Sequence, residues 1–447
     1  MDGMWTLPLE MRRYIEALEQ EIQQLKKKNQ ELEEGNKKLR ETIQALEKHL
    51  KAYENPHTPP SKQRFKRNQG RGGSLPGKRG APIGHKGATR EQPLPTQTKL
   101  YRLKGCPYCG GTIIKLPEVL KRVIEEIPEP QPAEAMEHII ETGICEKCGK
   151  VVAESDLPEE GNFGKNLLSH VTLMRFEDRL PIRKVVESLK RQHRVELTHT
   201  TVLDITRRVS DKLKAEYKQI IYEIRRSPFV YIDQTDIKVD GVTYQLWVFV
   251  TKNCTLFIIR KAEYANVMKT VLGRQYKGII IGDGLETYRQ YTDFIQRCWA
   301  HLLRESADLA EKHDSAKNLH ETLKKLYEKV KNVTYEDPPD KRQELYDKCI
   351  AEMIQWIDYA DTYKELRKFA VKLSNGLNHW FTRILYPFIE ATNNIAERSL
   401  REFVVIRKII GTLRNTKGTE IVETIMTMIA TWKQRRLDTF SMMRVSI

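Results

Sequence analysis

The fold is decided by three consecutive segments, which read SPFVYIDQTDIKV (227–239), VTYQLWVFVT (242–251) and TLFIIRKAE (255–263). Their content of β-branched and aromatic residues is typical of β-strands. Asp240 and Gly241, which separate the first two segments, are the signal of a two-residue hairpin turn. The three segments therefore predict three antiparallel strands.

The chain continues with a helix and one more strand. Residues 265–275 (ANVMKTVLGRQ) predict the helix, and residues 278–284 (GIIIGDG) predict a short apolar strand that ends in a turn. Three antiparallel strands, a helix and a further buried strand are the start of a ribonuclease-H-like α/β layer.

Three acidic residues lie on separate elements of this layer. Asp233 follows the apolar run FVYI within the first strand, Asp283 ends the strand GIIIG, and Glu397 lies in the first turns of a helix that begins in ATNNIAERSLR. A carboxylate within an apolar strand is costly unless it is paired or bound to a metal. Acids on three separate elements can meet at one point and hold two divalent cations.

Each acid also has a structural interpretation. Asp233 can pair with a lysine, Asp283 can cap the next helix, and Glu397 can pair with Arg401 four residues on. Asp236 competes with Asp233 as the acid of the first strand, but it lies on the opposite strand face. For each of the three acids, the metal-binding and the structural interpretation both stay open at this point.

Two further stretches are predicted to be helical. Residues 163–226 carry apolar residues at helical spacing, with Thr198 or Thr200 as N-cap of the second helix. A helix, a short turn and a basic helix are typical of a helix-turn-helix, and a plain helical bundle fits equally well. Residues 303–390 carry interspersed charge and are expected to be a helical insertion in the α/β domain.

Two Cys-x-x-Cys pairs precede the helices, and each is followed by glycine. Such a pair can form a tight knuckle, and two knuckles supply the four thiolates of a tetrahedral zinc site that is structural rather than catalytic. The segment between them has to hold a short meander, with LKRVIEEIP (120–128) and EHIIETGI (137–144) as strands. Reduced, metal-free cysteines are the alternative. The four residues are Cys106, Cys109, Cys145 and Cys148.

A basic linker precedes the cysteine pairs. Residues 54–95 are dominated by proline, glycine and basic residues and should not pack on their own. Residues 51–104 hold most of the chain's net charge of +16. Since each basic side chain can replace a counterion on DNA, we favour DNA contact over a solvated spacer. The candidate DNA-binding residues are Arg64, Lys66, Arg67, Lys78, Arg79, His85, Lys86 and Arg90.

Residues 11–53 carry a heptad repeat over six heptads. β-branched residues at a with leucine at d favour a parallel two-stranded coiled coil, and asparagine at a fixes its register. We therefore expect a homodimer or a higher oligomer, and a long helix packed on its own protein is the alternative. The a positions are Ile15, Ile22, Asn29, Asn36, Ile43 and Leu50, and the d positions are Leu18, Leu25, Leu32, Leu39, Leu46 and Tyr53.

The composition excludes several classes of protein. A chain of 447 residues is long enough for several domains, and its 40% of hydrophobic residues excludes wholesale disorder. No apolar run reaches the roughly 20 residues of a membrane span, and the first residues lack the apolar core of a signal peptide. The odd count of seven cysteines favours an intracellular metal site over a disulfide framework. The positive charge indicates nucleic acid as the partner.

The acidic candidates lie in short blocks that have counterparts in a known family. These are YIDQTDIKVDG (231–241), IIGDGLETY (280–288), CWAHLLRE (298–305) and NNIAERSLR (393–401). They resemble the Asp-Asp-Glu blocks of the insertion-sequence-66 transposases, a family with a ribonuclease-H-like catalytic domain. One departure is Gln234, since family members usually carry glutamate there.

The N-terminal half resembles the same family. NPHTPPSK (55–62) and GAPIGHKGATR (80–90) are similar to its Pro-Pro-Ser and Gly-His-Lys-Gly elements, and the double Cys-x-x-Cys is similar to its zinc-binding domain. The resemblance covers nearly the whole chain in order.

The expected architecture is therefore a multidomain α+β chain. Its parts are a coiled-coil dimerisation helix (11–53), a basic DNA-contacting arm (54–99), a zinc-ribbon-like zinc-binding domain (100–155), a helical, helix-turn-helix-like DNA-binding region (160–226), and a ribonuclease-H-like catalytic domain in two parts (227–302 and 391–447) around the helical insertion (303–390).

By this resemblance the catalytic triad is Asp233, Asp283 and Glu397, which hold two Mg²⁺ or Mn²⁺ ions per active site. Arg398 and Arg401 beside Glu397 either bind phosphates of the cleaved strand or form surface ion pairs. The implied supporting residues are Trp299, His301 and Arg304.

The resemblance implies a DNA transposase. A metal-activated water hydrolyses a phosphodiester at the end of a mobile element, and the freed 3′-hydroxyl then attacks target DNA. The partners are the double-stranded DNA of element ends and target, a second copy of the chain, and the small accessory proteins with which family members often act. The expected setting is the prokaryotic cytoplasm, at the nucleoid. The alternative is a non-catalytic or domesticated DNA-binding protein derived from a transposase, which would not need all three acids.

Overall fold

The structure is a computed structural model that describes residues 9–53, 91–102, 104–114, 120–153, 161–261, 264–284 and 286–447. The chain divides into two units, Met1–Pro130 and Gln131–Ile447. No helix within the described ranges is both long enough and apolar enough to cross a membrane.

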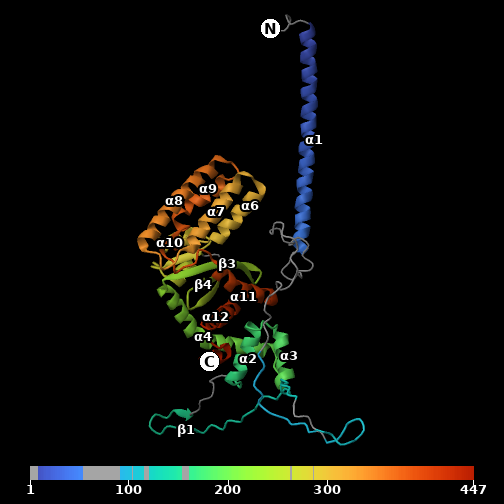
Figure 1. Ribbon diagram of the computed structural model, residues 1–447, viewed down its shortest axis with the longest axis vertical. Helices are drawn as coiled ribbons and strands as arrows, with labels where there is room; N and C mark the ends of the chain where they lie inside the picture. Colours follow the sequence, from blue (N-terminus) through green and yellow to red (C-terminus); the bar gives the residue numbers. More distant parts are fainter. Residues whose placement is uncertain are drawn as a thin grey trace. The chain divides into compact units, whose positions relative to one another are not determined.

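The first unit contains the helix α1 (Leu9–Tyr53), which runs unbroken through the heptad repeat (Figure 1). Its described a and d side chains are exposed by between 49% and 61%. A stripe of half-exposed leucine and isoleucine along one helix calls for a partner helix, so the exposure is consistent with the predicted coiled coil. The side chains in question are Ile22, Leu25, Leu32, Leu39 and Ile43, and those of residues 9–19 and 45–53 lie outside the described part.

The second unit is built on one five-stranded sheet. Its strands are β3 (Phe229–Val239), β4 (Val242–Val250), β5 (Thr255–Arg260), β6 (Ile279–Gly282) and β7 (Ile295–Arg297). They lie in the order β5-β4-β3-β6-β7; the pairs of β3, β4 and β5 are antiparallel, whereas β6 runs parallel to β3 and to β7.

The predicted strands and their hairpin are confirmed. Asp240 and Gly241 have φ values of 49° and 74°, as a tight hairpin turn between two right-twisted strands requires. The helix α5 (Tyr264–Leu272) then leads to β6, of which every residue is buried. A continuous apolar strand such as IIIG is stable there because both faces of the sheet are covered.

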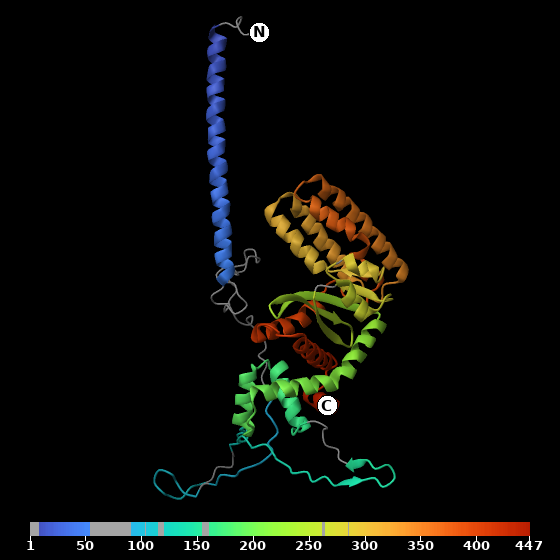
Figure 2. The same ribbon diagram turned by 180° about the vertical axis from the view of Figure 1, so that it is seen from behind.

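Helices from both ends of the second unit share the core of the sheet. They are α2 (Lys165–Phe176), α3 (Ile182–His193), α4 (His199–Arg226), α11 (Asn394–Ile410), α12 (Thr416–Gln434) and α13 (Thr439–Ser446). In Figure 2, α4 and α12 lie side by side, and α12 also packs against β5, whereas α11 packs against β3 and β4.

The helix α4 begins at a predicted cap. The hydroxyl of Thr198 accepts a hydrogen bond from the amide of Thr201 at 3.1 Å, which satisfies one free donor of the first turn. From Val202 to Ile224 one face of α4 is buried in the core. A helix held along its length in this way favours the helical-bundle interpretation over a free recognition helix.

The helix α12 covers the outer edge of β5. Glu423, Thr427 and Thr431, spaced one helical turn apart, accept hydrogen bonds from the amides of Ile259, Phe257 and Thr255 at 2.5, 2.9 and 3.2 Å. We call these three side chains the edge ladder. It satisfies amides that an edge strand would otherwise leave unpaired.

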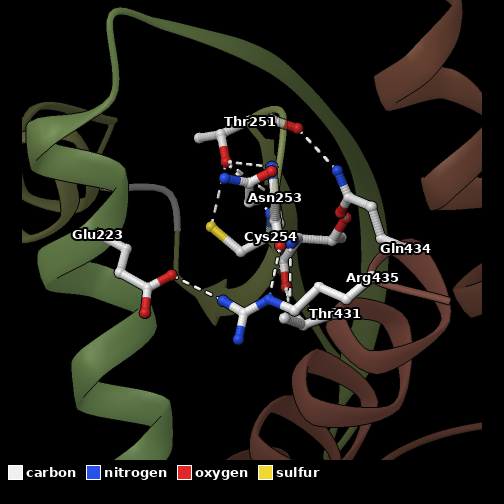
Figure 3. Close-up of polar contacts among 8 residues, drawn as sticks. Glu223, Thr251, Asn253, Cys254, Thr431, Gln434 and Arg435 are labelled. Carbon is white, nitrogen blue, oxygen red and sulfur yellow. Dashed lines mark hydrogen bonds and ion pairs between the residues drawn. The ribbon is translucent and has the colours of Figure 1, made fainter. Parts of the chain in front are cut away.

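The polar contacts continue past the end of β5 (Figure 3). Gln434 donates a hydrogen bond to the carbonyl of Thr251 at 2.7 Å. Arg435 donates to the carbonyl of Asn253 at 2.9 Å and to the carboxylate of Glu223 on α4 at 2.7 Å. The end of α12 is thereby joined both to the β4–β5 turn and to α4.

A second hydrophobic core belongs to the helices between β7 and α11, which form a separate bundle at one end of the sheet (Figure 1). The bundle consists of α6 (Trp299–Lys312), α7 (Ser315–Asn332), α8 (Pro339–Thr362), α9 (Arg367–Asn375), the short η3 (Leu377–His379) and α10 (Thr382–Leu385). Its core begins at Trp299, a few residues before the position where the sequence indicates the insertion.

The segment between the cysteine pairs is less regular than predicted. Residues 120–128 form no strand, so this prediction is wrong, and of residues 137–144 only β1 (Thr142–Ile144) is extended; it pairs with β2 (Val151–Ala153). Leu120, Ile124 and Ile127 are exposed by 76% or more. Apolar alternation without a second layer to cover it does not suffice to form a strand.

Candidate active site

Two of the three predicted acids lie level with each other in the sheet. The strands β3 and β6 are parallel, and their last registered pair is Tyr231 with Ile281. Asp233 and Asp283 each come two residues after that pair. Because equivalent side chains of neighbouring parallel strands point to the same face, both carboxylates lie on one face of the sheet, at the edge where β6 ends and midway along β3.

The third acid is brought to this edge by Asn393, the residue before α11. Its side-chain amide donates a hydrogen bond to the carbonyl of Ile232 at 2.7 Å, and its backbone amide donates to Sγ of Cys298 at 3.1 Å. Asn393 is the N-cap residue of α11, but its side chain makes no cap hydrogen bond and instead bonds to β3. Glu397 follows in the first turn of α11.

The charges of the other two acids act on Asp233. Burial raises the pKa of Asp233 to about 6, and the charges of Asp283 and Glu397 raise it as well, although the amide of Gln234, at 2.8 Å, acts in the opposite direction. Neighbouring carboxylates are costly to keep ionised together unless a cation binds them.

Tyr288 is a buried member of this site to which the sequence analysis gave no role. Burial holds its pKa well above the usual value, and the charges of Asp283 and Asp233 act in the same direction. A Cβ on Gly282 would lie 2.7 Å from the Tyr288 ring, so the glycine leaves room for it. The signal was present in the block IIGDGLETY, in which Tyr288 is the only aromatic residue.

His301 is a neighbour of Glu397. Its Nε2 is 3.8 Å from Oε1 of Glu397. Cys298, His301 and Glu397 offer ligand atoms that all lie within 4.8 Å of one another. The sequence indicates His301 as a supporting residue, whereas it gives Cys298 no role.

The donors present fit divalent cations. Among the described side chains of the site, Oε1 of Glu397 and Oδ1 of Asn393 are buried without a hydrogen-bond partner. Buried oxygens without partners are costly, and carboxylate and amide oxygens are the ligands that Mg²⁺ and Mn²⁺ prefer. Asp233, Asp283 and Glu397 are the residues that would hold such ions.

The structural alternatives for Asp233 and Glu397 are not realised in the described residues, and the capping role of Asp283 stays untested because residue 285 lies outside them. Asp233 forms no ion pair with a lysine, and Glu397 pairs with His301 rather than with Arg401. Arg398 and Arg401 are exposed on α11 and form no ion pair there; the side chain of Arg398 contacts only the carbonyl of Asn394, at 3.3 Å. Both arginines therefore have exposed cationic groups beside Glu397.

Two other predicted supporting residues lie differently. Trp299 is fully buried in the core of the helical bundle, where its indole donates a hydrogen bond to the carbonyl of Trp380 at 2.5 Å. Arg304 is exposed on α6, one turn after His301. Trp299 thus fixes the start of α6, and with it His301, from inside the bundle.

The cysteine pairs form two knuckles with the same backbone pattern. The amides of Cys106 and Cys145 donate to the carbonyls of Gly111 and Lys150, both at 2.9 Å, and Gly110 and Gly149 donate back at 2.8 Å. These two glycines have φ values of 73° and 68°, which other residues rarely adopt. The backbone of each pair thus forms a tight knuckle, and zinc binding by its thiolates stays a prediction.

The knuckle amides also favour thiolates. The amide of Tyr108 is the main cause that lowers the pKa of Cys106, and the amide of Cys148 lowers that of Cys145. The two knuckles belong to different units of the structure, so four-thiolate coordination remains a prediction. All eight candidate residues of the basic arm, from Arg64 to Arg90, lie outside the described residues.

Comparison with protein families gives a single assignment. A family model described as the IS66 family of transposases matches residues 160–421, which is more than half of the chain and includes the three acids. No curated protein matches the chain. The chain therefore belongs to the IS66 family of transposases.

Proposed function

We propose that the protein is an Asp-Asp-Glu DNA transposase with Asp233, Asp283 and Glu397 as its catalytic residues. The observation that supports the proposal is that Asp233 on β3 and Asp283, directly after β6, each follow the same registered pair by two residues. The charges of Asp283 and of Glu397 on α11 both raise the pKa of Asp233. The order β5-β4-β3-β6-β7, with two antiparallel pairings on one side and two parallel pairings on the other, supports a ribonuclease-H-like catalytic domain.

The chemistry follows from what these side chains can bind. Two Mg²⁺ or Mn²⁺ ions held by the carboxylates would lower the pKa of the attacking water or 3′-hydroxyl and stabilise the leaving oxygen. Asp233 and Asp283 would bind the ions from the sheet. Asn393, which is bonded to β3, would place Glu397 against the same ions. Arg398 and Arg401 present cationic groups to the phosphates of the strand that is cut.

The remaining modules fit the handling of two element ends. The exposed seam of α1 would join two copies of the chain, so that two active sites are held together. The basic arm supplies contacts to phosphates, and a zinc ion between the two knuckles would give the segment between them a fixed shape.

The test is metal-dependent cleavage of DNA that carries the native flanks of the gene. Wild type is compared with Glu397→Gln, and Glu402→Gln serves as a matched control because Glu402 is an exposed glutamate on the same helix that pairs with Arg179. We expect cuts at discrete positions for wild type and the control and none for Glu397→Gln. Equal cutting by Glu397→Gln would refute the catalytic assignment, and binding without cutting by wild type would indicate the non-catalytic alternative.

A further inference from the structure

Arg297, a half-buried cation, links the helical bundle to the loop that follows Asp283. Arg297 is the last residue of β7, where it is paired with Gly282 of β6. Its Nη2 donates a hydrogen bond to the carbonyl of Gly284 at 3.2 Å, directly after Asp283. Its Nη1 donates to the carbonyl of Lys372, in the last turn of α9, at 3.1 Å. One guanidinium therefore joins the loop of a catalytic acid to the bundle.

The space around Arg297 is shaped for this side chain. Its guanidinium lies over the ring of Trp380, 4.9 Å from the centroid. A Cβ on Gly284 would lie 2.2 Å from Nε of Arg297, and a Cβ on Gly376 would lie 2.3 Å from its Nη1. Gly284 also has a φ of 90°. Two glycines on opposite sides of one side chain leave it little freedom to move.

The contacts of Trp380 extend the connection into the bundle. Its indole donates to the carbonyl of Leu373 at 3.2 Å, and its carbonyl accepts from Gln296 of β7 at 3.1 Å. Lys372 pairs with Glu305 on α6, the helix that carries His301. A displacement of α9 would thus change contacts both of the loop after Asp283 and of α6.

We propose that Arg297 is a positioning residue through which the helical bundle sets the place of Asp283 at the metal site. The proposal rests on the proposed function, because it assigns Arg297 a role only if Asp283 binds the catalytic cation. It gives the inserted bundle a function, namely that the catalytic loop is in place only when α9 is docked. Arg297 itself touches neither the cation nor the DNA.

Two variants test the contact between Arg297 and the bundle, one on β7 and one in the bundle. Arg297→Lys keeps the charge but loses the planar fork that reaches two carbonyls at once. Gly376→Ala places a Cβ against Arg297 from the bundle, without altering the catalytic loop. Arg383→Lys is the matched control, because Arg383 also bonds two carbonyls, those of Val330 and Val333, at 2.6 and 3.1 Å, but lies within the bundle.

The readouts are Mn²⁺ binding by the full chain with DNA present, measured by electron paramagnetic resonance, and the Mn²⁺ concentration for half-maximal cleavage. We expect Arg297→Lys and Gly376→Ala to weaken Mn²⁺ binding and to raise that concentration roughly tenfold, the scale of lost contacts that orient a metal ligand. Arg383→Lys should bind Mn²⁺ like wild type. The thermal unfolding temperature of each variant distinguishes a displaced Asp283 in a folded protein from loss of the fold.

The outcomes are distinct. If Asp283→Asn binds Mn²⁺ and cleaves like wild type, the proposed function fails. If Asp283→Asn is inactive while Arg297→Lys and Gly376→Ala behave like wild type, the function stands and the role of Arg297 is overturned. A loss in Arg383→Lys equal to that in Arg297→Lys would also overturn it, since the effect would then belong to bundle packing in general.

Discussion

Asp233 and Asp283 stand level on neighbouring parallel strands, each two residues beyond the pair formed by Tyr231 and Ile281. Two carboxylates held side by side at a partly buried edge repel each other when both are ionised. The sheet geometry that creates the site therefore also lowers the stability of the folded protein when no cations are bound.

This cost predicts a pH-dependent gain in stability for Asp233→Asn. Burial raises the pKa of Asp233 from 3.8 to about 6. The stabilisation by the bound proton is complete below pH 4 and is lost as the pH rises through 6. Without added Mg²⁺ or Mn²⁺, the variant should be more stable than wild type at pH 8 by up to about 3 kcal/mol, and nearly equal at pH 4.

Urea unfolding at the two pH values measures this difference. Asp236→Asn is the control, because Asp236 is exposed on the opposite face of β3. A stability difference between Asp233→Asn and wild type that does not change with pH would contradict the prediction.

Soft metal ions should inhibit the enzyme at Cys298, His301 and Glu397. Zinc prefers the sulfur and nitrogen donors that lie within 4.8 Å of the Glu397 carboxylate. We expect added Zn²⁺ to inhibit Mg²⁺-dependent cleavage, and Cys298→Ser or His301→Gln to weaken that inhibition several-fold relative to each variant's own uninhibited rate. Cys254→Ser is the control, since this buried thiol lies in the β4–β5 turn (Figure 3). Inhibition of equal strength in all variants would place the inhibitory ion elsewhere.

The edge ladder should contribute measurably to folding. Thr427→Val leaves the buried amide of Phe257 without its partner at 2.9 Å, which should cost about 1–3 kcal/mol of unfolding free energy. Thr172→Val is the matched control, because the buried hydroxyl of Thr172 bonds only to the carbonyl of Leu168 in its own helix. Denaturant unfolding compares the two, and equal losses would show that the amide of Phe257 does not depend on Thr427.

The knuckles should bind about one zinc ion per chain. Cys106→Ser and Cys145→Ser each remove one thiolate from a set of four, so metal analysis should show that zinc is lost in either variant. Cys349→Ser, at a fully buried thiol of the helical bundle, should retain it. Zinc content that survives both knuckle substitutions would rule out the shared site.

The apolar seam of α1 should hold two chains together. Leu32→Asp at a d position should lower the particle mass measured by light scattering, because a carboxylate at the seam loses the burial that drives association. Lys27→Asp, on the outer side of the same helix, is the control and should leave the mass unchanged. A Leu32→Asp protein of wild-type mass would exclude α1 as the main contact.

The strands and the acids were predictable because their signals are local. Alternating and continuous apolar runs, with Asp240 and Gly241 between them, define β3 to β6, and the carboxylates end or interrupt those runs. Residues 120–128 show the limit of this reasoning, since an apolar pattern alone did not make a strand there.

The contacts that position the acids were not predictable from local patterns. Asn393 reaches Ile232 across 161 positions of sequence, and Arg297 reaches Lys372 across 75. A side chain that bonds a distant carbonyl leaves no periodicity in the sequence, and only the three-dimensional arrangement reveals it. For the same reason the sequence placed Tyr288 and Cys298 in the family's blocks but did not show that they lie at the site.

The edge ladder has a consequence for damaged copies of the gene. A copy interrupted after Glu397 but before α12 still encodes all three acids, yet its product lacks the helix that closes the sheet. The open amides of Thr255, Phe257 and Ile259 then offer a template for strands of other chains. Such truncated products should be removed by aggregation and proteolysis rather than persist as inactive competitors for DNA ends.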